Sequence, residues 1–195
     1  MKLPERVLFV WGALKSPRHL GSITPSSHFL VNTLLSLGHV RSASHILELG
    51  PGTGPFTVGL LQAMAPDARL LCIERDAAFA EYLRQRCNDP RLTVAVGDAE
   101  HMAAIADDHG FPRQWPLIVS GLPFTSLPPT VRDAILETVK QSLLPGRPFL
   151  LYQYSRAMLP HFRRYFTSVT IRREFRNLPP AYAFAFRNPV ERGRE

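Results

Sequence analysis

The stretch Leu47-Glu48-Leu49-Gly50-Pro51-Gly52-Thr53-Gly54-Pro55-Phe56 joins an apolar, β-rich run to a helical pattern. Its glycines allow a ligand to approach the backbone closely, because they carry no side chain. In an open sheet of parallel strands, the loop after the first strand lies at the carboxyl edge, where ligands bind. The stretch therefore predicts an α/β fold with a ligand site in this loop.

Outward from this loop, β-rich runs alternate with helical patterns. We expect strands at 45–50, 69–74, 92–97, 117–122 and 149–154, and helices at 55–64, 77–87, 99–109 and 129–144. This alternation predicts a parallel sheet with helices on both faces. After the fifth strand we expect a helix at 157–166, and residues 167–175 and 182–186 are typical of an antiparallel hairpin.

Length and composition favour a single domain. The chain has 195 residues, of which 45% are hydrophobic, so it can bury a full core. We divide it into an N-terminal segment at 1–44, an α/β core at 45–188 and a polar tail at 189–195. The longest apolar runs fall short of the roughly 20 residues that a membrane-spanning helix needs.

Charge and cysteine content restrict the partners. The formal net charge of +7 indicates an anionic partner, which could be nucleic acid, an acidic membrane face or a phosphate-bearing substrate. The two cysteines, Cys72 and Cys87, form no CxxC motif, which argues against structural zinc and suits a reducing cytoplasm. We therefore expect a cytoplasmic protein without a metal site.

The Gly-rich loop departs from two common nucleotide-binding motifs. The dinucleotide fingerprint, counted from Gly50 and Gly52, needs a third glycine where Pro55 stands, and no Gly-Lys-Ser/Thr follows as in a P-loop. The remaining pattern, E-x-G-x-G-x-G, resembles the first motif of S-adenosylmethionine-dependent methyltransferases. That resemblance implies a Rossmann-like, seven-stranded, mostly parallel sheet that ends in an antiparallel hairpin.

Acidic residues at the ends of two further strands support the same cofactor. Glu74 follows the loop by about 20 residues, where a carboxylate can accept ribose hydroxyls. The resemblance implies that Asp98 accepts from the adenine amine and that Glu48 lies near the methionine amino group; Asp98 could also cap a helix. The expected cofactor-binding residues are Pro25, Ser26, Ser27, Glu48, Gly50, Pro51, Gly52, Thr53, Gly54, Glu74, Arg75, Asp98, Ala99 and Ser120.

The fourth predicted strand ends in Ser120-Gly121-Leu122-Pro123-Phe124, where the resembling enzymes place the methyl acceptor. It is similar to the N-L-P-Y/F tetrad of ribosomal RNA adenine dimethyltransferases, but Gly121 stands where an Asn carbonyl would accept from adenine. Those enzymes also carry a helical domain after the hairpin, which we do not expect here. Methylation of RNA adenine is therefore an alternative, as is a non-catalytic module that binds S-adenosylmethionine.

A closer resemblance, over nearly the whole chain, is to the bacterial phospholipid N-methyltransferase family, which methylates the amine of phosphatidylethanolamine. It rests on the stretch 21–27, on Gly121-Leu122-Pro123, on Tyr152-Gln153-Tyr154 and on the stretch 176–181. It implies a lid over the cofactor at 25–27, whose serines could equally cap a helix at 28–37. The expected catalytic residues are Gly121, Leu122, Pro123, Phe124 and Tyr154.

These catalytic residues have distinct expected roles. Because Gly121 abuts the methyl group in the resembling enzymes, a larger residue there should block the acceptor and spare cofactor binding. Tyr154 is the first candidate for accepting the proton of the headgroup ammonium. Phe124, Tyr152 and Tyr154 could stabilise methylated cations through cation–π contacts, or could be core aromatics.

Two basic segments suit a lipid surface. Residues 4–14 place an apolar stripe at helical spacing (Val7, Val10, Trp11, Leu14), with Lys2, Arg6, Lys15 and Arg18 around it, so this helix could lie in the headgroup plane or pack on the core. Arginines and aromatics also gather at 156–176, and arginine forks suit lipid phosphate or an RNA backbone. We expect a monomer, peripheral on the inner face of the plasma membrane, that binds anionic lipid more readily than nucleic acid.

Overall fold

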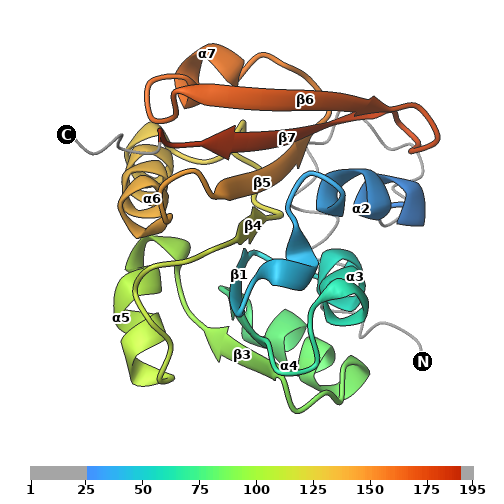
Figure 1. Ribbon diagram of the computed structural model, residues 1–195, viewed down its shortest axis with the longest axis vertical. Helices are drawn as coiled ribbons and strands as arrows, with labels where there is room; N and C mark the ends of the chain where they lie inside the picture. Colours follow the sequence, from blue (N-terminus) through green and yellow to red (C-terminus); the bar gives the residue numbers. More distant parts are fainter. Residues whose placement is uncertain (1–25, 190–195) are drawn as a thin grey trace.

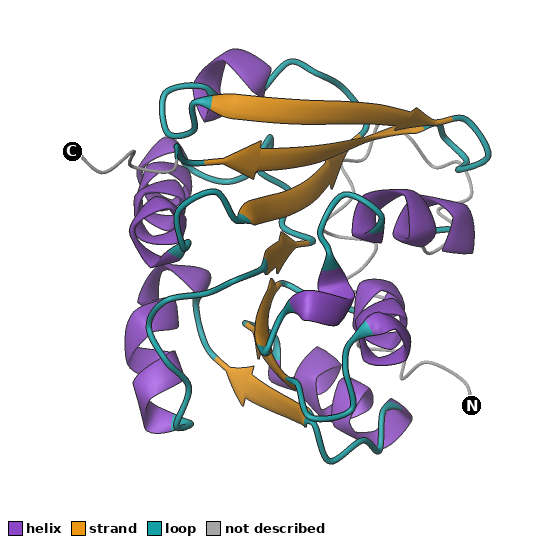
Figure 2. Ribbon diagram, viewed as in Figure 1, coloured by secondary structure: helices purple, strands orange, loops and turns teal. Residues whose placement is uncertain are grey.

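A computed structural model describes residues 26–189, in which a seven-stranded sheet carries helices on both faces (Figures 1 and 2). The strand order is β3-β2-β1-β4-β5-β7-β6, and all pairs are parallel except those of β7. The strands are β1 (His45–Leu49), β2 (Arg69–Glu74), β3 (Leu92–Val96), β4 (Ile118–Ser120), β5 (Pro148–Gln153), β6 (Ser168–Glu174) and β7 (Ala181–Arg187).

Local sequence signals begin several of the helices. Pro55 and Pro129 occupy first-turn positions, where the missing N–H costs nothing, and Asp76 accepts from the N–H groups of Ala78 and Phe79. The helices are α2 (His28–Leu35), α3 (Pro55–Ala63), α4 (Ala77–Arg86), α5 (Met102–Asp108), α6 (Pro129–Ser142) and α7 (Leu159–Phe162), with 3-10 turns η1 (Val40–Ser42) and η2 (Ala99–His101).

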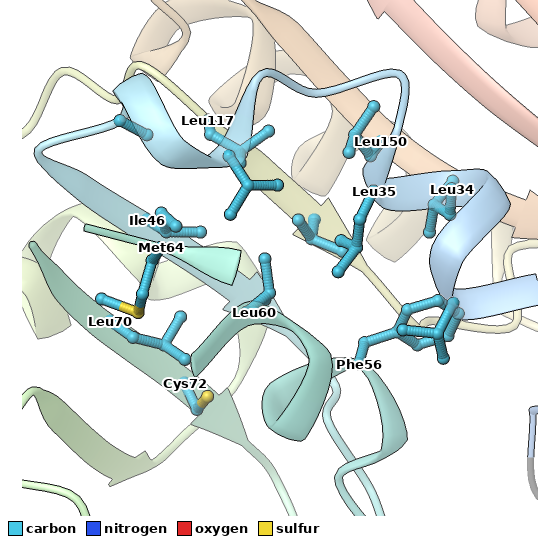
Figure 3. Close-up of a cluster of buried hydrophobic side chains, with 14 of the residues drawn as sticks. Leu34, Leu35, Ile46, Phe56, Leu60, Met64, Leu70, Cys72, Leu117 and Leu150 are labelled. Carbon is cyan, nitrogen blue, oxygen red and sulfur yellow. The ribbon is translucent and has the colours of Figure 1, made fainter. Parts of the chain in front are cut away.

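The core consists of two layers, one on each face of the sheet. Alternate side chains of a strand point to opposite faces, so Ile46 packs under α2 and α3 whereas Leu47 packs under α5 and α6. Figure 3 shows the first layer, where Leu34, Phe56 and Leu60 from the two helices meet the strand side chains. Each fully buried side chain of this size contributes about 1.5–3 kcal/mol.

The strand order reverses between β1 and β4, which creates a crevice at the carboxyl edge of the sheet. The chain crosses from β1 outward to β2 and β3, and then returns so that β4 pairs with β1 on its other side. In open α/β sheets this switch point is where ligands bind. The loops after β1, β2, β3 and β4 therefore meet at one edge.

The predicted fold is confirmed, with two corrections. The helix expected at 157–166 reduces to α7: Pro160 lies in its first turn, so the helix begins only at Leu159, and the residues after Phe162 form turns. The segment expected as a helix at 99–109 begins with the 3-10 turn η2 before α5. The proposed N-terminal helix and Pro25 lie outside the described residues. None of the helices within 26–189 is long and apolar enough to cross a membrane.

Candidate active site

The loop after β1 adopts a backbone that favours glycine. Gly50, Gly52 and Gly54 have φ values of 66°, 55° and 79°, in the left-handed region where a Cβ is disfavoured. The N–H of Gly54 donates to the carbonyl of Pro51 at 2.9 Å, which closes the turn before α3. The loop therefore exposes backbone rather than side chains to the crevice.

Glu74, at the end of β2, holds this loop in place. Its Oε2 accepts from the N–H of Gly52 and its Oε1 from the N–H of Asp76, each at 3.0 Å. Burial raises the pKa of Glu74, while these backbone hydrogen bonds lower it. Each carboxylate oxygen has a second lone pair, so Glu74 can still accept hydroxyl groups of a ligand.

Asp98, two residues after the end of β3, presents its carboxylate to solvent. Its Oδ1 lies 3.2 Å from Nε of Arg75, and both side chains are well exposed. The interpretation of Asp98 as a helix cap is wrong for its side chain, which accepts no cap hydrogen bond from η2. Asp98 and Arg75 thus pair with each other at the carboxyl edge of the sheet, and their contact with a cofactor stays a prediction.

Glu48 is buried beneath the loop rather than exposed in it. Thr57 Oγ1 and Cys72 Sγ donate to its Oε2, at 2.7 and 3.2 Å. Burial raises the pKa of Glu48 to about 7, an effect that these two donors only partly offset. Glu48 precedes Gly50 by two residues in the chain. Its contact with a methionine amino group stays a prediction.

The β4 tail packs directly on the cofactor loop. A Cβ on Gly121 would lie 2.5 Å from the carbonyl oxygen of Gly50, which is backbone and cannot rotate away. Ser120 is buried, and its Oγ accepts from the N–H of Leu122 at 3.2 Å. The expectation that a larger residue at 121 would spare cofactor binding is therefore corrected, because a side chain there would displace Gly50.

The aromatic residues expected near the acceptor differ in exposure. Phe124 is fully buried, and its ring packs edge-on against Phe149 and Phe162. Phe124 is therefore a core residue, and its expected cation–π contact is wrong for this structure. Tyr152 is partly buried against Phe56, whereas Tyr154 is 47% exposed. Tyr154 is thus the accessible aromatic of the three.

The proposed role of Tyr154 as proton acceptor needs correction. Burial raises the pKa of Tyr154 to about 12, so the phenol is neutral near pH 7. A neutral phenol has lone pairs that accept a hydrogen bond, but it does not retain an additional proton. Tyr154 can orient an amine and is unsuited to act as its base.

The N-terminus of α2 is tied to the β6–β7 turn, a relationship that sequence reasoning missed. Ser27 Oγ caps α2 by accepting from Leu30 N–H at 3.3 Å, and Ser27 N–H donates to Oδ1 of Asn177 at 3.0 Å. Farther along, Thr33 Oγ1 donates to Glu174 at 2.6 Å. These partners lie 150 and 141 residues apart, and no local signal in the sequence pairs them.

The arrangement suits S-adenosylmethionine. A loop without side chains, an acid at the end of β2 and a second acid at the end of β3 provide close backbone approach and acceptors for hydroxyl and amine groups. Within residues 26–189, no group of His, Cys, Asp and Glu side chains could hold a metal ion.

Comparisons with known proteins identify the family. Residues 46–146 match the family described as methyltransferase domain. The ornithine lipid N-methyltransferase of Singulisphaera acidiphila is 35% identical over 190 residues, which cover 94% of this chain and 96% of that protein. A probable ribosomal RNA small subunit methyltransferase A of Halobacterium salinarum is 33% identical, but the match covers 56% of this chain and 34% of that protein.

Solved structures share the fold at low sequence identity. The N-methyltransferase NodS from Bradyrhizobium japonicum, in complex with S-adenosyl-l-homocysteine, has a TM-score of 0.63 at 17% identity and covers 84% of this chain and 89% of its own. The precorrin-6y C5,15-methyltransferase from Geobacter metallireducens has a TM-score of 0.65 at 13% identity and covers 87% of this chain and 92% of its own.

Proposed function

This chain belongs to the methyltransferase domain family and uses S-adenosylmethionine, and from that premise we propose that it methylates the primary amine of a membrane lipid. Phosphatidylethanolamine is the first candidate substrate, from the sequence motifs described above. Ornithine lipid is the second, because a relative that matches 94% of this chain bears that activity in its name. That nearly full-length match carries the proposal, since the ribosomal RNA enzymes match about half of the chain.

The proposed chemistry requires positioning more than acid–base catalysis. When bound, S-adenosylmethionine supplies an electrophilic methyl group on a sulfonium. The loop at 50–54 and the carboxylates of Glu74 and Asp98 would hold the cofactor at the carboxyl edge. An uncharged amine nitrogen then attacks the methyl carbon in line, so the N–C bond forms as the S–C bond breaks.

The acceptor lies, in this proposal, between the β4 tail and the end of β5. Gly121 keeps the β4 tail against the loop, which leaves the acceptor a short path to the cofactor. The hydroxyl of Tyr154, a half-exposed residue, accepts a hydrogen bond from the amine and orients its lone pair. Because Tyr154 is neutral, we assign it a positioning role, and the ammonium proton leaves to water.

The direct test is transfer of labelled methyl groups. Purified protein receives labelled S-adenosylmethionine with vesicles that contain phosphatidylethanolamine or ornithine lipid, or with ribosomal RNA. We expect label in the lipid fraction, identified by mass spectrometry as methylated headgroup, and a large loss of label for Asp98→Asn. Label in RNA alone, or in no acceptor, would overturn the proposal. The ratio of the two lipid products decides between the substrates.

A further inference from the structure

The turn between β6 and β7 carries two strongly exposed apolar side chains. Phe175 and Leu178 are 66% and 71% exposed, more than any other large hydrophobic side chain within residues 26–189. Figure 1 shows this turn projecting at the end of the sheet beside α2. Exposed apolar groups at one tip indicate a partner that removes them from water.

Hydrogen bonds fix this tip, so the two side chains are held outward. Asn177, which lies between them, is buried; its Oδ1 accepts from Ser27 N–H at 3.0 Å and its Nδ2 donates to the carbonyl of Pro179 at 2.7 Å. On the other side, Arg176 Nε donates to Glu174 at 2.9 Å. A fixed presentation lowers the entropy that docking would cost.

Cationic side chains surround the same tip. The guanidinium carbons of Arg156 and Arg173 lie 5.6 and 5.3 Å from the ring centroid of Tyr182, so both approach one aromatic side chain. Both arginines are exposed, and neither lies within 4.0 Å of a carboxylate in the described part of the chain. Two guanidinium groups without a carboxylate partner suit a phosphate.

Strand register places this tip at the edge that holds the cofactor loop. Gln153 at the end of β5 pairs with Tyr182, and Glu174 at the end of β6 pairs with Ala181. Because β5 runs parallel to β4, and β4 to β1, the turn lies beyond the carboxyl ends of all these strands. A surface that binds the tip therefore faces the candidate active site.

We propose that the β6–β7 tip docks the protein on an anionic bilayer. Phe175 and Leu178 enter the boundary between headgroups and acyl chains, while Arg156 and Arg173 bind lipid phosphates. The inference extends the proposed function, because an enzyme that acts on lipid amines needs its site turned toward the membrane. RNA is disfavoured as the occupant, since the aliphatic Leu178 has no ring on which a base could stack.

Vesicle sedimentation tests the apolar part of this surface. Phe175→Ser with Leu178→Ser should reduce binding to phosphatidylglycerol-containing vesicles about tenfold, since each side chain loses part of its burial. Val96→Ser is the matched control, because Val96 is also exposed but lies on β3 at the opposite end of the strand order. Unchanged binding of the double variant, in protein with a wild-type melting temperature, would overturn the proposal.

Arginine variants test the phosphate contacts. Arg156→Ser with Arg173→Ser should reduce binding at low salt and have little effect at high salt, where exposed charges are screened. Arg147→Ser is the control, because Arg147 is exposed at the amino end of β5, the edge opposite the tip. Equal losses in the control and the double variant would indicate general charge attraction and overturn the assignment of Arg156 and Arg173.

A dispersed substrate separates this inference from the proposed function. The Phe175→Ser, Leu178→Ser variant should methylate a short-chain lipid amine, present as monomers, at the wild-type rate, yet methylate vesicles several-fold more slowly. If the wild type methylates neither substrate, the proposed function fails, whereas sedimentation still decides the docking surface. RNA binding that depends on Phe175, without vesicle binding, would overturn the docking proposal.

Discussion

Gly121 and Gly50 are in backbone contact, at a spacing that leaves no room for a Cβ on Gly121. Such an atom would lie 2.5 Å from the Gly50 carbonyl oxygen, and the Gly121 N–H already donates to the carbonyl of Leu49 at 2.9 Å. A Cβ on Gly50 would in turn lie 2.6 Å from Cδ2 of the Leu122 side chain. The segments expected to hold the acceptor and the cofactor are therefore coupled through their backbones.

We predict that Gly121→Ala weakens cofactor binding and turnover together. The added Cβ must displace the loop at Gly50, and overpacking of this kind costs about 1–3 kcal/mol, or roughly tenfold or more in affinity. Calorimetry with S-adenosyl-homocysteine and a methyl-transfer assay measure the two effects. Gly110→Ala is a control away from the loop: its φ of 65° strains an alanine locally, but a Cβ added there would meet no atom within 4 Å. If Gly121→Ala binds the cofactor normally but loses turnover, Gly121 affects only the position of the acceptor.

Asp98→Asn should lower cofactor affinity with little change in stability. The substitution keeps the shape of the side chain but removes the charge, and an exposed ion pair such as that with Arg75 contributes about 0–1 kcal/mol. The expected loss in affinity is about tenfold, the effect of one charge-assisted hydrogen bond. Asp107→Asn is a matched control, since Asp107 also pairs with an exposed arginine, Arg113, away from the loop. An unaltered affinity for Asp98→Asn would remove Asp98 from the site.

Local sequence patterns predicted the loop and the strand ends that parallel pairing brings to its edge. Gly50 to Gly54 form one loop, Glu74 ends β2 and Asp98 follows β3, and the parallel pairing of these strands brings them to the same edge. These positions follow from periodicity and from the rule that parallel strands share a carboxyl edge.

The features of the site that the sequence did not predict depend on packing between residues far apart in the chain. The burial of Phe124 depends on Phe149 and Phe162, which come from two later elements. The contact of Ser27 with Asn177 depends on how α2 sits against the hairpin turn. Likewise, the sequence shows that residue 121 is a glycine, but it does not show that the carbonyl oxygen of Gly50 leaves no room for a side chain there.

Tyr154→Phe should reduce turnover a few-fold without changing the shape of the pH profile. The phenol, with its pKa raised to about 12, does not ionise between pH 6 and 10, so its removal deletes a hydrogen bond and no titrating group. The expected loss matches a neutral hydrogen bond, about 0.5–1.5 kcal/mol. Initial rates across this pH range, measured for variant and wild type, should give parallel curves. If one limb of the pH–rate profile disappears in Tyr154→Phe, the tyrosine does transfer the proton.

Glu48→Gln should stabilise the fold at alkaline pH and weaken cofactor binding. The folded-state pKa of about 7 lies above the ordinary value of 4.5, so the folded protein favours the protonated carboxyl. The stability that the folded protein gains from a protonated Glu48 is fully present below pH 4.5 and is lost as the pH rises through about 7. Glutamine stays neutral, so above pH 8 the variant should gain on the order of 3 kcal/mol, at about 1.4 kcal/mol per pKa unit.

The same charge would favour a bound ammonium group, as the resemblance implies for Glu48. Denaturant unfolding should therefore show no gain in the stability of Glu48→Gln at pH 4 and a clear gain at pH 8. Calorimetry at pH 8 should show weaker cofactor binding by the same variant. Glu81→Gln is the control, because Glu81 is exposed on α4 and pairs only with Arg84 and Gln85 among the described residues. If Glu48→Gln is less stable than wild type at pH 8, the donors Thr57 and Cys72 outweigh the cost of burying the carboxylate.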